Sequence, residues 1–177
     1  MTTRRLHSMF LMGAALVAAH GAKAGAMPEN PIERQVRREL ITLPFYSLFD
    51  NLSFRVEGDT VTLMGQVTRP VLKTGAENVV KRLERVGKVV NEIEVLPLSP
   101  HDDGIRVGVY RAVYGHSAMF PYALRAMPPV HIIVKNGNVT LEGVVATAMQ
   151  KNVAGIEAGS VPGVFSVTNN LRVEDAS

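Results

Sequence analysis

Hydrophobic residues follow two different periods along the chain, and the two periods alternate in a regular order. Apolar positions three or four residues apart, as at Ile32, Val36, Leu40 and Leu43, are typical of the buried face of a helix. Apolar residues at every second position are typical of strands with one buried face. The order of these patterns predicts helix, strand, strand, helix, strand, and that order occurs twice.

Each half opens on a helix with a recognisable start. In the first half Asn30 suits the N-cap, Pro31 the first helical position and Glu33 the third. In the second half we expect Asp103 to be the cap. The apolar stripe of that second helix comprises Ile105, Val109, Ala112 and Val113.

Tight turns set the register of the predicted hairpins. Asn136-Gly137 tolerates the positive φ of a two-residue turn, and Glu57–Thr60 is a weaker turn of the same kind. On the other face of the second hairpin, His131 is expected to oppose Glu142 as an exposed pair. The pairs expected on the inner faces are Val56 with Val61, Phe54 with Leu63, Val134 with Val139, and Ile132 with Leu141.

A second helix and a last strand complete each half. The helices are expected near 69–85 and 147–159, with Ala76, Val79, Val80 and Leu83 on the inner face of the first. The predicted fold class is α+β: two αββαβ units, each a three-stranded mixed sheet with two helices on one face. The last strands carry Val89, Asn91, Ile93 and Val95 in one half and Val167, Asn169, Leu171 and Val173 in the other.

The two halves are copies of one another. Aligning residues 56–95 with 134–173 at a constant offset of 78 gives 12 identities in 40 positions without a gap. Units of this size are marginally stable alone, so the copies are expected to pack together. Pro97–Pro100 marks the short linker.

The second copy resembles the BON domain, a family of bacterial envelope proteins named for osmotically inducible protein Y and nodulation proteins. The resemblance is carried by Val139-Thr-Leu-Glu-Gly143, a helix, and then Val161-Pro-Gly-Val-Phe-Ser-Val-Thr-Asn-Asn-Leu-Arg-Val173. The first copy keeps the same pattern at 61–65 and 89–95, but has Arg85 where the second has Gly163. We expect BON units at 29–98 and 103–175. The structural-motif residues are Gly65, Asn91, Gly137, Gly143, Gly163 and Asn169.

The resemblance implies an exported, cofactor-free and non-catalytic protein. It implies binding to anionic phospholipid or attachment to the envelope, in support of envelope integrity or a stress response. In one branch of the family the lipid-facing surface is the first helix of the second copy. That helix here carries Tyr110, Arg111 and Tyr114, which would suit the headgroup level of a membrane. The alternative is that both tyrosines pack against Phe120 or Tyr122.

The first 26 residues have the pattern of a secretory signal peptide. Arg4 and Arg5 precede a short apolar run, and small residues follow through Ala24 and Ala26, after either of which cleavage is expected. An uncleaved membrane anchor is the alternative. The chain has no cysteine, which excludes a lipoprotein, so the predicted location is the periplasm.

Charge adds one further candidate surface. Three of the 19 basic residues lie in the signal segment, leaving 16 against 16 acidic residues, so no nucleic-acid partner is expected. A basic group does gather at the second helix of the first copy, with Glu77 and Glu84 between its members: Arg69, Lys73, Lys81, Arg82, Arg85 and Lys88. It is either a solvated face or a second contact with anionic lipid.

Nothing in the sequence predicts a catalytic or metal site. His101, His116 and His131 are scattered, and no nucleophile motif surrounds Ser117. His101-Asp102-Asp103 is better explained as an acidic helix start than as a cation site. The competing functional class is a protein–protein adaptor or chaperone-like module. It would use open sheet edges and an uncovered sheet face carrying Ile133 and Val144, with the oligomeric state left open.

Overall fold

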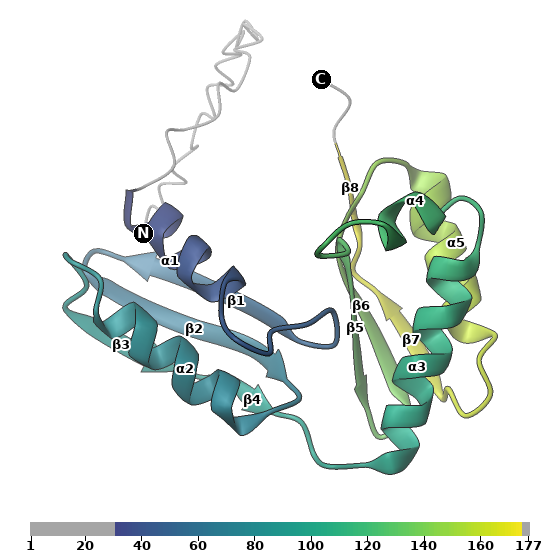
Figure 1. The fold of residues 1–177 in the computed structure, drawn as a ribbon, viewed down its shortest axis with the longest axis horizontal. Coiled ribbons are helices and arrows are strands. Elements are labelled where there is room, and N and C mark those ends of the chain that lie inside the picture. Colours follow the sequence, from purple (N-terminus) through teal and green to yellow (C-terminus); the bar gives the residue numbers. More distant parts are fainter. Residues whose placement is uncertain (1–30, 175–177) are drawn as a thin grey trace, which may run out of the picture.

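The computed structural model describes residues 31–174 as two αβ units that lie side by side (Figure 1). The expected order of elements is confirmed in both units, with a short extra helix, α4, and with each last strand divided in two. The predicted signal peptide and the Asn30 cap lie outside these residues. The first unit contains α1 (Pro31–Ile41), β1 (Asn51–Glu57), β2 (Thr60–Val67), α2 (Pro70–Lys81), β3 (Lys88–Asn91) and β4 (Glu94–Val95). The second contains α3 (Pro100–Gly115), α4 (Phe120–Ala123), β5 (Val130–Lys135), β6 (Asn138–Val145), α5 (Ala148–Gly159), β7 (Ser166–Asn169) and β8 (Arg172–Val173).

Each sheet is built around its second strand. β2 pairs antiparallel with β1 and parallel with β3 and β4, and β6 pairs in the same way with β5, β7 and β8. The predicted registers are confirmed: Val56 opposes Val61, and Val134 opposes Val139. A mixed sheet with its helices on one face is therefore present twice (Figure 1).

Two separate hydrophobic cores lie between the sheets and their helices. The stripe predicted for α1 is buried in the first core, at Ile32, Val36, Leu40 and Leu43. The second core takes Ile105, Val109 and Val113 from α3, while Ala112 is only partly buried.

The start of α3 differs from the prediction. The N-cap is Ser99, whose hydroxyl accepts a hydrogen bond from the Asp102 amide at 3.2 Å, and not Asp103. The helix begins earlier because Pro100 suits its first turn. Asp102 is thereby buried, and its carboxylate accepts hydrogen bonds from the amides of Asn136 and Gly137, each at 2.9 Å. It ties α3 to the β5–β6 turn.

A glycine in the second strand of each sheet lets the first strand cross it closely. Gly65 and Gly143 have φ of 110° and 126°. A Cβ at Gly65 would lie 2.0 Å from the Asn51 carbonyl oxygen, and one at Gly143 would lie 1.9 Å from that of Pro129. No other residue fits this approach, which explains the shared glycine.

An asparagine breaks each last strand at the same place. The Asn91 amide donates to the Lys73 carbonyl oxygen at 3.0 Å, and its oxygen accepts from the Ile93 amide at 3.2 Å. Asn169 repeats both contacts, with Lys151 at 2.7 Å and Leu171 at 3.2 Å. The side chain thus holds the interrupted strand to the second helix of its unit.

The turn before β3 keeps its backbone shape although its glycine is missing. Arg85 has φ of 73°, and the corresponding Gly163 has φ of 89°. The turn is therefore left-handed with arginine as with glycine, and the arginine costs about 1 kcal/mol in that conformation. The chain already leaves the helix at Arg82, so α2 ends earlier than the predicted residue 85.

Substituting Gly143→Ala should lower the free energy of unfolding by about 3 kcal/mol, because the new Cβ overlaps the Pro129 carbonyl at a positive φ. Urea denaturation followed by circular dichroism measures the change. Gly104→Ala is the matched control, since its Cβ would meet nothing within 4 Å inside α3. Equal stability of the two variants would contradict the explanation.

Candidate functional site

The structure places Tyr114 inside the second core, so its ring is not available to lipid at the surface. Its side chain is 2% exposed, and its hydroxyl donates to the Val130 carbonyl oxygen at 2.7 Å and accepts from the Val130 amide at 3.0 Å. Burial raises the pKa of this phenol well above its usual value. The expected position of Tyr114 on a lipid-facing surface is thus corrected: its hydroxyl satisfies the Val130 amide and carbonyl at the edge of β5.

The other two candidates on α3 differ from one another. Tyr110 is partly buried against the second core, with its ring centroid 5.3 Å from that of Tyr114. Arg111 is exposed. Of the three predicted residues on α3, only Arg111 is therefore exposed.

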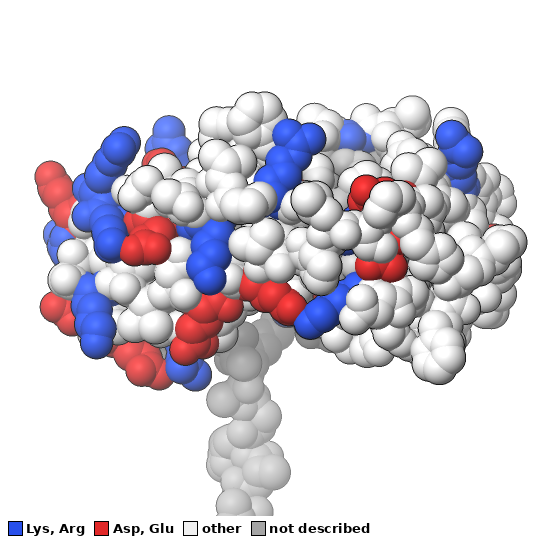
Figure 2. Space-filling view, turned by 90° about the horizontal axis from the view of Figure 1, so that it is seen from below, with Lys and Arg blue, Asp and Glu red and all other residues white. Residues whose placement is uncertain are grey.

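The basic group near α2 is exposed but interleaved with acidic side chains. Lys81, Arg82, Arg85 and Lys88 are all at the surface. Lys81 pairs with Glu77, and this hydrogen bond, followed by one from Asn91, lowers the pKa of the Glu77 carboxyl. Figure 2 shows basic and acidic side chains alternating over the first unit on the face it displays, whereas the second unit carries few charges there.

An exposed apolar rim at one end of the second unit was not foreseen. Phe120 and Leu124, in and just after α4, are 52% and 75% exposed, and Met149 at the start of α5 is 62% exposed. The Tyr122 hydroxyl, which donates to the Gln150 side chain at 3.0 Å, joins the two segments. The sequence suggests only that Phe120 is a packing partner for the α3 tyrosines. The run Phe120-Pro-Tyr-Ala-Leu124 was the signal that could have revealed the rim.

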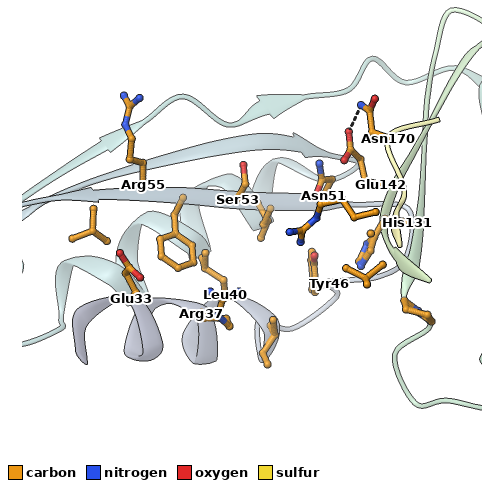
Figure 3. Close-up of a pocket in the computed structure, with 18 residues that line it drawn as sticks. Glu33, Arg37, Leu40, Tyr46, Asn51, Ser53, Arg55, His131, Glu142 and Asn170 are labelled. Atoms are coloured by element: carbon orange, nitrogen blue, oxygen red, sulfur yellow. Dashed lines mark hydrogen bonds between the residues drawn. The ribbon is translucent and has the colours of Figure 1, made fainter. Parts of the chain in front are cut away.

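A groove of about 690 Å³ lies between the two units (Figure 3). One wall is α1 and the strand β1, and the other comes from β5, β6 and the start of β8 in the second unit. Two aromatic residues line it, Tyr46 and Phe54. Its charged lining residues are Glu33, Arg37, Arg55, Glu142 and Arg172.

The units are joined by the loop that precedes β1. The Leu48 carbonyl oxygen accepts a hydrogen bond from the Ile132 amide at 2.8 Å, on the edge of β5. The side chains of Leu48 and Phe49 pack against the core of the second unit. One unit therefore supplies part of the other's hydrophobic packing.

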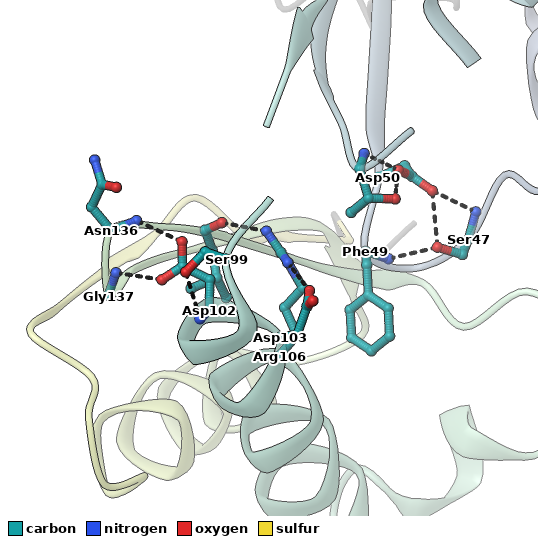
Figure 4. Close-up of polar contacts among 11 residues, drawn as sticks. Ser47, Phe49, Asp50, Ser99, Asp102, Asp103, Arg106, Asn136 and Gly137 are labelled. Atoms are coloured by element: carbon teal, nitrogen blue, oxygen red, sulfur yellow. Dashed lines mark hydrogen bonds and ion pairs between the residues drawn. The ribbon is translucent and has the colours of Figure 1, made fainter. Parts of the chain in front are cut away.

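Asp50 holds this loop in shape (Figure 4). It is fully buried, and one carboxylate oxygen accepts from the amide and hydroxyl of Ser47 at 3.0 and 2.9 Å. The other oxygen accepts from the amide and hydroxyl of Thr68 at 2.7 and 2.8 Å. Four donors thus compensate the buried carboxylate and fix the loop against the end of β2.

The outer face of the second sheet turns toward the first unit. Ile133, expected to be exposed, is 5% exposed, and Val144 is partly buried in the groove wall. Lys135 forms an ion pair with Glu94 across the junction. The prediction of an open apolar face is corrected for Ile133, because the first unit covers it.

His131 belongs to the same junction. It opposes Glu142 as predicted, but the two are not an exposed pair. Its Nδ1 lies 2.6 Å from the Asp50 carbonyl oxygen, its ring is 5.8 Å from that of Tyr46, and Glu142 accepts from Asn170 instead. Burial lowers the pKa of His131, although the nearby Asp50 and Glu142 charges act in the opposite direction.

Within residues 31–174 no group of three histidine or acidic side chains is arranged to hold a metal ion. The Asp102 carboxylate accepts hydrogen bonds from the Asn136 and Gly137 amides, and Asp103 pairs with Arg106. No helix in that part of the chain is both long enough and apolar enough to cross a bilayer.

The chain belongs to the BON-domain family. The model of the BON domain matches residues 28–97 and 122–175, which is more than half of the chain and includes parts of both units. The second match begins at α4, so α3 lies outside it. No curated protein matches the chain significantly.

Among solved structures, the chain is similar to two of CdsD, described as a structural protein of the type III secretion system of Chlamydia trachomatis. The first, a C-terminal domain, has 14% identity and a TM-score of 0.29, covering 84% of this chain and 100% of that one. The second has 15% identity and a TM-score of 0.31, covering 81% and 92%.

Substituting Asp50→Asn should lower the free energy of unfolding by about 3 kcal/mol. The new amide nitrogen would face either the Ser47 or the Thr68 donors and could not accept their hydrogen bonds as the carboxylate oxygen does. Thermal and urea unfolding measure the loss. Asp59→Asn, on the exposed β1–β2 turn, should stay within about 0.5 kcal/mol of the parent. A similar loss for both variants would show that Asp50 has no special role.

His131 should make stability depend on pH. Its pKa is lowered in the folded state, so below about pH 6.5 the unfolded chain takes up a proton that the folded chain resists. Relative to His131→Gln, the parent should lose on the order of 1 kcal/mol between pH 7.5 and 5. Chemical denaturation across this range measures the difference between the two proteins. A difference that stays constant with pH would contradict the buried neutral imidazole.

Proposed function

We propose that this protein is a non-catalytic, exported envelope protein that docks peripherally on anionic phospholipid through the apolar rim of its second unit, defined by Phe120, Leu124 and Met149. Membership of the BON-domain family supports an envelope role, in envelope integrity or a stress response, and the periplasm is the proposed location. The exposure of the rim is the observation that carries the proposal.

The rim has the chemistry of a shallow membrane contact. Phe120 and Leu124 are four residues apart, so they project from the same side of the α4 turn. Exposed large apolar side chains gathered at one end of a domain mark an interaction surface. A short turn of this kind reaches only the headgroup and upper acyl region, which suits reversible binding.

Basic side chains next to the rim favour an anionic leaflet. The Arg125 guanidinium lies 4.9 Å from the centroid of the Tyr122 ring, beside Leu124. Arg111 is exposed on α3, the helix against which α4 packs. Each basic group near a charged leaflet contributes roughly 1 kcal/mol, an attraction that salt weakens.

The basic group near α2 is a separate candidate contact. Figure 1 shows α2 in the first unit and α4 at the far end of the second, so the two candidate contacts are separate surfaces. Because Lys81 is already paired with Glu77, we assign the principal contact to the rim and a secondary one to Arg82, Arg85 and Lys88.

Co-sedimentation with phosphatidylglycerol vesicles tests the proposal. Replacing Phe120 and Leu124 together by Gln should weaken binding at least tenfold, since burial of each large apolar side chain is worth about 1.5–3 kcal/mol. Arg111→Ala with Arg125→Ala should remove much of the salt-dependent part. Phe165→Gln, which alters an even more exposed aromatic residue away from the rim, should bind as the parent does.

Two results would overturn this function. One is the absence of sedimentation at low salt by the parent protein. The other is equal binding by the parent and the Phe120/Leu124 variant, with circular dichroism showing that both are folded.

A further inference from the structure

The first strand of each sheet lies at an edge, and the hairpin register shows which backbone groups face outward. In a two-residue hairpin, the residues flanking the turn exchange both hydrogen bonds, and alternate residues then point away from the partner strand. Glu57 opposes Thr60, so the backbone groups of Phe54 and Val56 point out of the sheet at β1. Lys135 opposes Asn138, so those of Val130, Ile132 and Val134 point outward at β5.

The outward edge of β5 is closed along its length. The Tyr114 hydroxyl bonds both the amide and the carbonyl of Val130. The Ile132 amide donates to the Leu48 carbonyl oxygen at 2.8 Å, and Arg106 donates to that of Val134 at 2.7 Å. A further strand could pair here only by displacing these contacts.

The same edge of β1 is closed only at its first outward residue. The Leu52 backbone lies beside the Tyr46 hydroxyl, at the place in the first sheet that corresponds to Val130 beside Tyr114 in the second. Further along, within residues 31–174, no strand pairs with the outer side of β1 at Phe54 and Val56. In the two copies, the outer edge of β5 is therefore occupied, whereas the outer edge of β1 is open at Phe54 and Val56.

The open edge faces the groove between the units. Six consecutive β1 residues, 51–56, line the groove, as expected when a strand presents its edge rather than one face (Figure 3). The second unit forms the opposite wall through Val144 and Arg172. A space of about 690 Å³ bounded in this way suits one extended chain and leaves no room for a second sheet.

We propose that this groove binds an extended peptide segment of a partner protein, which adds to β1 as a further strand. A peptide supplies the backbone donors and acceptors that Phe54 and Val56 need, whereas an acyl chain supplies none. The guanidinium of Arg37 lies 5.7 Å from the centroid of the Phe54 ring, and Arg55 and Arg172 are also in the lining. The lining also holds Glu33 and Glu142, and Arg55 pairs with Glu57, so alternating apolar side chains rather than charge define the segment.

The probe is a displayed library of random twelve-residue peptides, selected on the chain without its predicted signal peptide. Val56→Pro removes one of the two outward amides of the edge and leaves the β1–β2 ladder in place. Val144→Arg fills the groove from the opposite wall. Peptides enriched on the parent should bind each of these variants at least tenfold more weakly, and should bind Phe165→Gln unchanged.

Hydrogen exchange measured by NMR identifies the binding mode. An enriched peptide should slow exchange of the Phe54 and Val56 amides at least tenfold, and the same peptide methylated on its backbone nitrogens should not. The inference fails if no enriched peptide depends on both Val56 and Val144, or if the β1 amides keep their exchange rates in the complex. It also fails if sedimentation shows a parent dimer that Val56→Pro converts to a monomer, because the occupant is then a second copy.

This site is independent of the proposed lipid contact. The Phe120/Leu124 variant should still bind the peptide, and Val56→Pro should still sediment with phosphatidylglycerol vesicles. Either activity can therefore fail without the other.

Discussion

A buried carboxylate with four donors organises the junction on which this two-unit molecule depends. Asp50 is fully enclosed, and Ser47 and Thr68 satisfy both of its oxygens. Such a group is stable only while every partner stays in place, because an uncompensated charge in a dry site is costly. The loop is thereby held where Leu48 reaches the edge of β5, where Asp50 presents its carbonyl to His131, and where the two units define a groove.

Sequence patterns were sufficient to predict the architecture because the same structural residues occur at corresponding positions in both copies. The shared positions of Gly65 and Gly143, and of Asn91 and Asn169, correspond to the same backbone crossing and the same broken strand. Turn chemistry set the hairpin registers. The helix start at Ser99 was missed because Asp103 is an equally good cap by composition, and only tertiary contacts assign Asp102 to the β5–β6 turn.

The candidate surfaces were harder to predict because they depend on contacts between segments far apart in the chain. From the sequence alone, a tyrosine at the margin of an amphipathic helix can face either the core or the solvent. Tyr114 faces the core because its hydroxyl hydrogen-bonds Val130 at the edge of β5. Burial of Ile133 and His131 depends on the first unit, which no local pattern encodes. The apolar rim and the open β1 edge lie where the copies differ, so the repeat itself gave no indication of them.

The loop bearing Leu48 and Phe49 also bears on how the chain reaches its final form. During synthesis this loop is complete before β5 has been made. The apolar side chains of Leu48 and Phe49 are then still without the core against which they pack. The later half then packs against them at the margin of its own core. The packing of the second unit therefore extends across the boundary between the copies. A fragment that begins at the linker lacks the Leu48 and Phe49 side chains that pack against its core.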